Sequence, residues 1–247
     1  MDKQVIDKKM SFEIDFLKKQ KYCFVDIPNK YSHYLAGVFQ LIDEAWKDPA
    51  PKISRLTKEG YTFYDGPSLP NVLYVSNFKE EHIAAIKKYL IETEVKKNLE
   101  KLFNSNIGVC NIRAYRFTHD PPREKTHYLD LLDENSKSFN AHRDGLLQGT
   151  LKMMIFKAKG EEKVTLQHGA LEICPNGQWI SIVGDSPIAA IFPPNIVLHR
   201  ALQPAPNKIR DAIELTIIKR KANDFLVESC GAHAGHPKDL NKWNEIE

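Results

Sequence analysis

The second half of the chain is a series of short strand-like segments that are separated by turns. The segments are rich in β-branched, aromatic and other apolar residues, and turn residues such as Pro175, Gly177 and Pro193 stand between them. Short strands with turns at this spacing are typical of an all-β barrel or sandwich. The predicted strands cover residues 107–117, 150–156, 164–173, 178–183, 196–200 and 209–217.

The first half is predicted to hold one strand, helices and a loop-rich stretch. Residues 22–27 resemble a strand that Pro28 ends. Residues 31–47 carry apolar side chains at helical spacing, and residues 79–104 do so as one helix or as two joined helices. Several prolines would interrupt any long element in residues 48–78, which are therefore predicted to be loop-rich and to cover the barrel or line a substrate entrance.

The strand-like second half contains a candidate metal site. His142 and Asp144 are two positions apart, so on a strand both side chains would point to the same face. His199 comes 55 positions after Asp144, next to another strand-like stretch. Two histidines and one carboxylate leave three octahedral positions open, an arrangement that suits non-haem Fe(II) oxygenases.

Arg210 is the candidate anchor for an anionic co-substrate. It follows His199 with ten residues in between, and on a strand it would share a face with Ala212. A guanidinium is planar, stays charged at any working pH and holds a carboxylate with two hydrogen bonds. Arg210 could therefore bind the far carboxylate of a 2-oxo acid whose other end chelates the metal.

Residues 107–219 resemble the Fe(II)/2-oxoglutarate-dependent dioxygenase family. The family pattern is His-x-Asp, a gap of some tens of residues, His, ten residues and then Arg-x-Ser. His142, Asp144, His199 and Arg210 match this pattern, whereas Ala212 stands where the family often has Ser. The resemblance implies a mostly β fold with flanking helices, in which a double-stranded β-helix (a cupin-like jelly roll) is supported by N-terminal helices.

The same resemblance implies roles for the matched residues. Fe(II) would be bound by His142, Asp144 and His199, with 2-oxoglutarate chelating the iron and Arg210 pairing with its 5-carboxylate. O2 would be the second co-substrate. In the family, the strand before His-x-Asp often gives polar groups to the co-substrate. Tyr115 is the preferred candidate for such a contact and Arg113 the second, although a half-buried aromatic and a salt bridge at the sheet rim would explain them as well.

Other residues compete for these roles. His168 is an alternative metal ligand, but no arginine follows it at the required distance. The sequence His-Arg-Asp also occurs in protein kinases, where Asn follows the Asp by five residues; that position is Gly149 here, and no Asp-Phe-Gly follows. A second metal site could form in the C-terminal part, from Cys230, His233 and His236, but no fourth ligand is evident.

The chain is predicted to be one domain built from three parts. Residues 1–106 would supply a strand and helices that pack on the core, residues 107–220 the catalytic jelly roll, and residues 221–247 a C-terminal extension. Within the core, residues 118–139 form a long polar insertion that leads into His142. Long loops of this kind are often lids or binding segments, so this insertion is predicted to lie at the mouth of the site.

Composition limits the partners and the compartment. The net charge is +3 and the lysines are scattered, which argues against nucleic acid as a partner. The sequence shows neither a signal peptide nor an apolar run long enough to span a membrane, and its four cysteines form no CxxC motif. These features predict a cytoplasmic protein with free thiols. They do not determine its oligomeric state.

The expected function is that of a 2-oxoglutarate-dependent dioxygenase, an oxidoreductase. Because Asp144 is present, the resemblance implies hydroxylation as the default, with desaturation or ring closure as variants, rather than halogenation. The expected substrate is a small molecule, such as an amino acid derivative or a natural-product intermediate. Three alternatives stay open: a protein side-chain hydroxylase with an open groove, a hydrolytic zinc enzyme, and a non-catalytic jelly-roll binding protein, which Ala212 alone favours.

Overall fold

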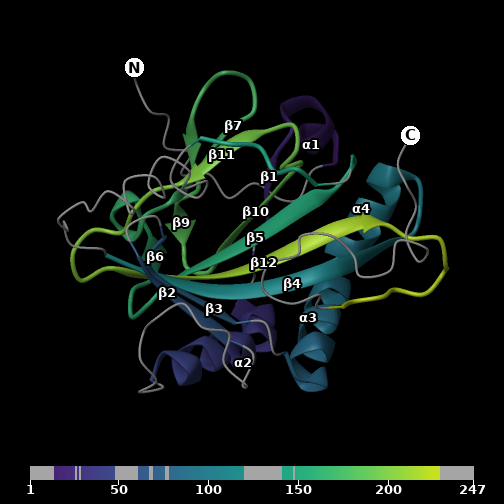
Figure 1. Cartoon of the computed structure of the whole chain (residues 1–247). Helices are drawn as coiled ribbons and strands as arrows, with labels where there is room; N and C mark the ends of the chain where they lie inside the picture. Colours follow the sequence, from purple (N-terminus) through teal and green to yellow (C-terminus); the bar gives the residue numbers. More distant parts are fainter. Residues whose placement is uncertain are drawn as a thin grey trace.

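The computed structural model describes residues 14–25, 27, 29–47, 61–66, 69–75, 78–119, 141–146 and 148–228. Within these ranges, strands predominate and the helices lie mainly in the first half of the chain (Figure 1). The helices are α1 (Ile14–Gln20), α2 (Asn29–Trp46), α3 (Glu80–Glu92) and α4 (Val95–Phe103), and a short 3-10 helix covers Leu166–His168.

The strands form one large sheet and two small ones, and all neighbouring strands are antiparallel. The large sheet has the order β1 (Cys23–Val25), β10 (Ile188–Phe192), β5 (Leu151–Ala158), β12 (Ile209–Lys219), β4 (Ile107–Thr118), β3 (Leu69–Val75) and β2 (Tyr61–Gly66). A three-stranded sheet has the order β11 (Leu198–Ala201), β7 (Leu171–Cys174) and β8 (Ile180–Ser181), and β6 (Lys163–Val164) pairs with β9 (Gly184–Asp185).

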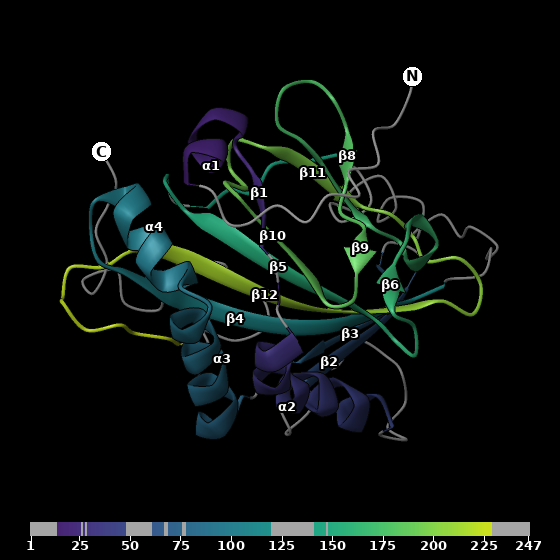
Figure 2. The same ribbon diagram turned by 180° about the vertical axis from the view of Figure 1, so that it is seen from behind.

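The large sheet separates two layers with two different cores. Helices α2 and α3 lie on one face, and the small sheets lie on the other (Figures 1 and 2). Strand β12 shows how the alternation of side chains serves both layers. Ile213 and Leu215 belong to the cluster that includes the helices, whereas Ala212 belongs to the cluster shared with the small sheets. Alternate residues of the central strands therefore face the space between the sheets, where the candidate site lies.

Helix α2 agrees with the prediction for residues 31–47. Leu35, Val38 and Ile42 recur at helical spacing and are fully buried. An ion pair adds a polar attachment: the buried guanidinium of Arg116 on β4 binds Asp43 of α2, with 2.6 Å between Nη2 and Oδ1. Apolar packing and this ion pair together hold the helix on the sheet.

The predicted helical stretch 79–104 forms two helices. Glu94 lies between α3 and α4 and adopts a left-handed conformation, with φ 59°. A left-handed residue cannot continue an α-helix, so the axis changes direction there. The apolar positions on both sides, among them Ile86 and Leu99, still reach the same core.

The stretch of residues 48–78, predicted to be loop-rich, contains two strands that were not predicted. Residues 61–75 contain the hairpin β2–β3, which extends the large sheet beyond β4. Pro70 lies at the start of β3, and only Val72–Val75 pair with β4. Proline is tolerated where a strand has no further partner to donate to.

Several predicted strands are shorter than expected, and the one predicted at residues 178–183 is reduced to β8. Residues 164–173 are divided by the 3-10 helix, because Gly169 turns the chain with φ 72° before β7 begins. In residues 196–200, strand β11 starts only at Leu198, so that His199 is its second residue. The division of the chain at residues 106 and 220 stays a prediction.

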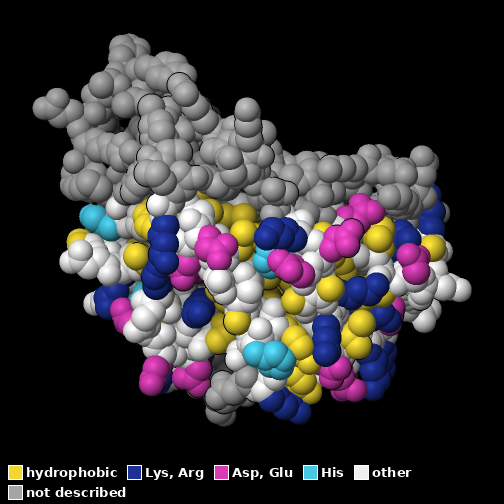
Figure 3. All heavy atoms as spheres, turned by 90° about the horizontal axis from the view of Figure 1, so that it is seen from below, with side chains coloured by type: hydrophobic (Ala, Val, Ile, Leu, Met, Phe, Trp, Pro, Cys, Tyr) yellow, Lys and Arg dark blue, Asp and Glu magenta, His cyan; other side chains and the backbone are white. Residues whose placement is uncertain are grey.

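The face seen from below carries lysine and arginine side chains interspersed with acidic ones, and hydrophobic side chains between them (Figure 3). Charges of both signs are therefore mixed over the part of this face that the described residues form. No helix in the described part of the chain is both long and apolar enough to cross a membrane.

Candidate metal centre

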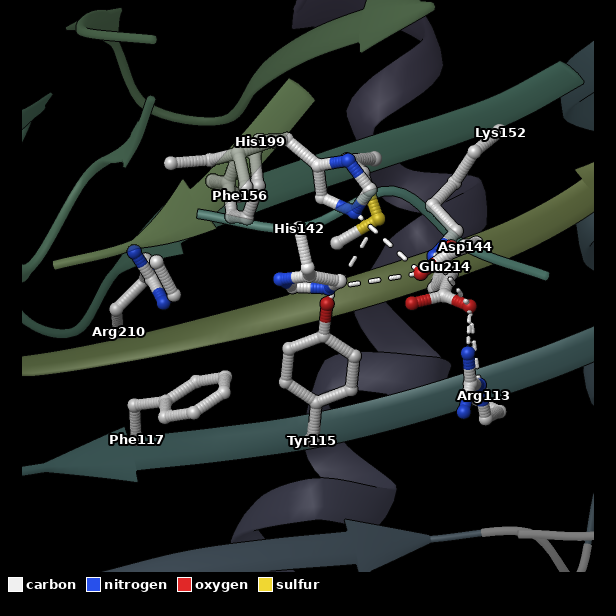
Figure 4. A pocket seen from close by; sticks show the side chains of 13 residues that line it. Arg113, Tyr115, Phe117, His142, Asp144, Lys152, Phe156, His199, Arg210 and Glu214 are labelled. Carbon is white, nitrogen blue, oxygen red and sulfur yellow. Dashed lines mark hydrogen bonds and ion pairs between the residues drawn. The ribbon is translucent and has the colours of Figure 1, made fainter. Parts of the chain in front are cut away.

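The three predicted metal ligands converge on one point. The Oδ1 atom of Asp144 lies 3.5 Å from Nε2 of His142 and 3.5 Å from Nε2 of His199. All three ligand atoms lie within 4.8 Å of one another, and Figure 4 shows the side chains turned toward each other. Donors about 2.1 Å from a shared ion are about 3 Å apart in an octahedron, so small movements would complete the site.

Backbone hydrogen bonds hold these residues together without a regular strand. His142 and His199 form an isolated antiparallel bridge, in which each N–H donates to the other's carbonyl oxygen at 3.0 and 2.9 Å. The N–H of Asp144 donates to the carbonyl of Pro194 at 2.9 Å. The strand expected around His-x-Asp is therefore reduced to one bridge. The spacing of two residues still places both side chains on the same side.

The surroundings of His199 select its metal-binding nitrogen. Nδ1 of His199 lies 3.0 Å from the carbonyl oxygen of Val197. A carbonyl oxygen only accepts hydrogen bonds, so Nδ1 carries the proton and donates, and Nε2 keeps its lone pair in the neutral ring. That lone pair points to the side of Asp144, and the ring is also fixed against Phe192, with 5.2 Å between ring centroids.

The carboxylate of Asp144 is held in its charged form. Burial alone would raise the pKa of Asp144, but the close contacts with the rings of His142 and His199 and the charge of Lys152 outweigh it. The pKa of Asp144 therefore lies well below its ordinary value. An ionised carboxylate is the form that binds a divalent cation.

Arg210 lies in the same cavity as the three ligands. The cavity has a volume of about 170 Å³, and Arg210 and the three ligands line it together with Tyr115. Arg210 is only 1% exposed, and its guanidinium lies over the rings of Phe117 and Phe156, at 4.8 and 5.2 Å from their centroids.

The guanidinium of Arg210 is short of hydrogen-bond partners. Among the described residues, Nε and Nη1 are buried and bind no acceptor. Burial lowers the pKa of Arg210 to about 10, partly offset by Tyr115. A buried cation that lacks an anion is unfavourable by itself, and its surroundings are suited to an anionic ligand that brings two oxygen atoms.

The two predicted co-substrate contacts lie in different halves of the cavity. Tyr115 pairs with Ala212 across the β4–β12 ladder, and its hydroxyl lies 3.7 Å from Sδ of Met154, close to the metal ligands (Figure 4). Arg113 lies at the end opposite Arg210 and binds Glu214 through Nε at 3.0 Å. This placement favours Tyr115 over Arg113 as a contact for a ligand of Arg210.

Lys152 and Glu214 also line the cavity, and the sequence prediction missed them. Lys152 on β5 contacts Oδ2 of Asp144 and lies 3.5 Å from Oε1 of Glu214 on β12. The strand period alone puts Lys152 on one face with Met154 and Phe156, and that alternation is the signal that could have revealed it.

His168, the competing metal ligand, does not line the cavity. His168 is buried and its Nε2 lies 3.2 Å from Oε1 of Glu161, while its Nδ1 accepts from the N–H of Thr165. The second site predicted from Cys230, His233 and His236 lies outside the described residues. The same holds for the insertion at 118–139, apart from Thr118 and His119.

Comparison with known proteins gives matches only among solved structures. No protein-family model matches the sequence, and a search of curated proteins finds no match. The non-haem α-ketoglutarate-dependent carbocyclase SnoK from nogalamycin biosynthesis is 11% identical, with a TM-score of 0.57 over 100% of this chain and 97% of that one.

Two further structures are similar over most of their length. AviO1 from Streptomyces viridochromogenes Tue57 is 12% identical, with a TM-score of 0.56 over 86% of this chain and 96% of that one. The dioxygenase for auxin oxidation 1 from Arabidopsis thaliana, solved as a binary complex with 2-oxoglutarate, is 13% identical, with a TM-score of 0.51 over 91% and 93%.

The chain has the double-stranded β-helix fold. The predicted fold class, mostly β with flanking helices, is thereby confirmed. Identities of 11–13% establish the fold alone, so the function has to be argued from the residues of the cavity.

Proposed function

We propose that this protein is an Fe(II)- and 2-oxoglutarate-dependent oxygenase that hydroxylates an unactivated C–H bond of a small molecule. One observation carries the proposal: a His-Asp-His cluster and a buried guanidinium without sufficient partners line the same cavity. 2-Oxoglutarate has a metal-chelating end and a distant carboxylate, so it would satisfy both features at once.

The residues of the cavity fit both groups. Two imidazole nitrogens and a carboxylate oxygen suit Fe(II) and leave three positions for other ligands. The N–H groups of Arg210 that lack an acceptor among the described residues fit a carboxylate. The rings of Phe117 and Phe156 lie over the guanidinium, where a carboxylate would not bind. A zinc hydrolase would use the same three ligands but would leave Arg210 without a role.

The side chains would hold the reactants rather than react themselves. Once bound, Fe(II) and 2-oxoglutarate supply the activation of O2: one oxygen atom enters the C–H bond, the other enters succinate, and CO2 is released. Asp144 stays ionised as a ligand, His199 presents Nε2, and Arg210 orients the co-substrate. The apolar side chains of Phe156, Phe192 and Met154 reduce the access of water.

The substrate class rests on a smaller set of observations. SnoK, which is similar over its whole length, is by name a carbocyclase of antibiotic biosynthesis, and this supports a small molecule such as a natural-product intermediate or an amino acid derivative. The charged end of the cavity, formed by Arg113, Lys152 and Glu214, would be in reach of polar groups on such a substrate.

Anaerobic titration tests the proposal. Fe(II) added to the protein with 2-oxoglutarate is expected to give the weak visible metal-to-ligand charge-transfer band of the chelate. His199→Ala should abolish the band, because one of three metal ligands is lost. Arg210→Ala should weaken 2-oxoglutarate binding about 100-fold or more, in line with the loss of a charge-assisted hydrogen-bonded pair of about 3 kcal/mol.

An exposed histidine provides the control for the loss of an imidazole. His33→Ala removes an exposed imidazole on α2, far from the cavity, and should leave the band unchanged. Absence of the band from folded wild-type protein with excess iron and co-substrate would reject the oxygenase and favour a non-catalytic binding protein. If the band appears, succinate release in the presence of candidate substrates would distinguish small-molecule substrates from peptides.

A further inference from the structure

Four charged side chains of alternating sign form a chain along the cavity, from the metal ligands to the end opposite Arg210. Lys152 contacts Asp144 and lies 3.5 Å from Glu214, and Glu214 accepts from Nε of Arg113 at 3.0 Å. Lys152 and Glu214 are 7% and 6% exposed in their side chains. A buried lysine is rare and unfavourable unless it is paired, so the burial of the Lys152 charge beside the metal ligands needs an explanation.

The two oxygen atoms of Asp144 have different surroundings. Oδ1 faces the Nε2 atoms of both histidines, at 3.5 Å each. Oδ2 accepts a hydrogen bond from the ammonium of Lys152. Because Lys152 occupies Oδ2, only Oδ1 is turned toward the metal position, and the carboxylate is oriented to donate one atom and not two.

The same ammonium separates two carboxylates. Glu214 lies on the face of β12 that lines the cavity, and its Oε1 is shared between Lys152 and Arg113. Burial alone would raise the pKa of Glu214, but the charges of Arg113 and Lys152 outweigh it, so the pKa is lowered and Glu214 is ionised. An ionised carboxylate beside a divalent ion is itself a suitable iron ligand.

We propose that Lys152 is a positioning residue that keeps the metal centre at three protein ligands. Its ammonium binds Oδ2 of Asp144 and Oε1 of Glu214, so that the first carboxylate binds the metal through one atom and the second does not bind it. This inference rests on the proposed function, since the positions that are kept open are those needed for 2-oxoglutarate and O2.

The test uses Mn(II), whose bound waters can be counted by water-proton relaxation and by oxygen-17 ENDOR. Six octahedral positions less three protein ligands leave three waters in the wild type. Lys152→Met has a side chain of similar length without the charge. This variant should hold fewer waters on Mn(II), because a further carboxylate oxygen occupies one of the six coordination positions. It should still bind the metal, because a positive charge beside the ion has been removed.

The second readout is 2-oxoglutarate affinity of the Mn(II)-loaded protein. Lys152→Met should lower it about tenfold or more, the usual effect of losing a group that orients a metal ligand. Lys152→Arg, which keeps a charge and donors, should restore most of the wild-type water count. Lys163→Met, which removes an exposed lysine on β6, is the matched control and should behave like the wild type.

A double variant separates positioning from a general loss of charge. Lys152→Met with Glu214→Gln removes one charge of each sign, so it keeps the charge balance of the cavity and has no intruding glutamate. Its water count and its 2-oxoglutarate affinity should rise above those of Lys152→Met. A double variant no better than the single one would overturn the role given to Glu214.

The outcomes distinguish this proposal from the function on which it rests. Wild-type protein that binds neither metal nor 2-oxoglutarate would overturn both. Wild-type protein that binds both, with Lys152→Met holding the same number of waters, would overturn only the positioning role. Lys152 would then serve merely to pair charges between β5 and β12. Circular dichroism of each variant shows whether a changed count comes from a folded protein.

Discussion

Arg210 shows a conflict between stability and binding within a single residue. Its charge is fully buried, and two of its nitrogen atoms, Nε and Nη1, have no acceptor among the described residues. Each buried unsatisfied donor costs roughly 1–3 kcal/mol. The folded protein tolerates this cost in a position where a dianionic co-substrate would remove it.

Replacing Arg210 should therefore stabilise the ligand-free protein. Arg210→Met keeps a side chain that fits between Phe117 and Phe156 but removes the charge, and we expect the free energy of unfolding to rise by about 1 kcal/mol or more. Urea unfolding without metal and 2-oxoglutarate measures this change. A variant less stable than the wild type would show that Arg210 already has a favourable environment.

The structure brings together the four residues that the sequence spacing selected, and their roles stay a prediction. His142, Asp144, His199 and Arg210 could be selected because the strand period and the required ligand chemistry are visible in local spacing. Lys152 and Glu214 could not be paired in advance, since their contact depends on the register between β5 and β12. That register is set by the whole sheet and not by either segment alone.

At the scale of elements, Gly169 fixes the approach of β7 to the segment after β11. It has φ 72°, and a Cβ atom there would lie 2.3 Å from the carbonyl oxygen of Leu202. The close approach brings β7 beside the strand that carries His199. Only glycine meets both the conformational and the steric requirement.

Gly169→Ala should therefore destabilise the protein more than a glycine replacement that introduces backbone strain without a steric clash. Gly177 has φ 82° but open space at its Cβ position, so Gly177→Ala should cost about 1–2 kcal/mol. Gly169→Ala should cost about 2 kcal/mol more, because backbone must move to admit the methyl group. Denaturant unfolding of the two variants in parallel gives the difference, and equal losses would contradict the steric argument.

The attachment of α2 to the sheet has its own pH dependence. Burial would raise the pKa of Asp43, but Lys159 and Arg116 outweigh it and lower the pKa. A carboxylate whose pKa is lowered in the folded state stabilises the folded protein at pH values above its unfolded pKa of about 4. This contribution is lost as the pH falls through the pKa of the folded state. Asp43→Asn should lower Tm at neutral pH and match the wild type in acid. A Tm difference that is constant with pH would argue against the ion pair.

The sequence predicted some helices and strands and missed others. Helix α2 followed from apolar spacing, because one buried face of a long helix is visible in sequence. The hairpin β2–β3 was missed because prolines near it resemble loop signals, whereas the partner that makes it a strand, β4, is over 30 positions away. Pairing with a distant strand leaves little mark on the local sequence.

At the scale of the whole molecule, metal binding should change local protection around the site. His142 is joined to β11 by one bridge, and Asp144 by one hydrogen bond to Pro194. With so few bonds, the amide hydrogens of His142, Asp144 and His199 should exchange more readily without a metal than those of the central sheet. Mn(II) should slow their exchange, as hydrogen exchange measured by mass spectrometry would show, whereas amides of β4 serve as the unchanged reference.

The bridge between His142 and His199 has a further consequence. The two residues are 57 positions apart (199 less 142), and a metal that binds both would act as a reversible cross-link closing a loop of that length. In the chain-entropy description, a covalent link over such a loop restricts the unfolded chain by about 4 kcal/mol. Under the proposed function, iron supply would then govern how long the protein survives proteolysis as well as whether it can react with O2.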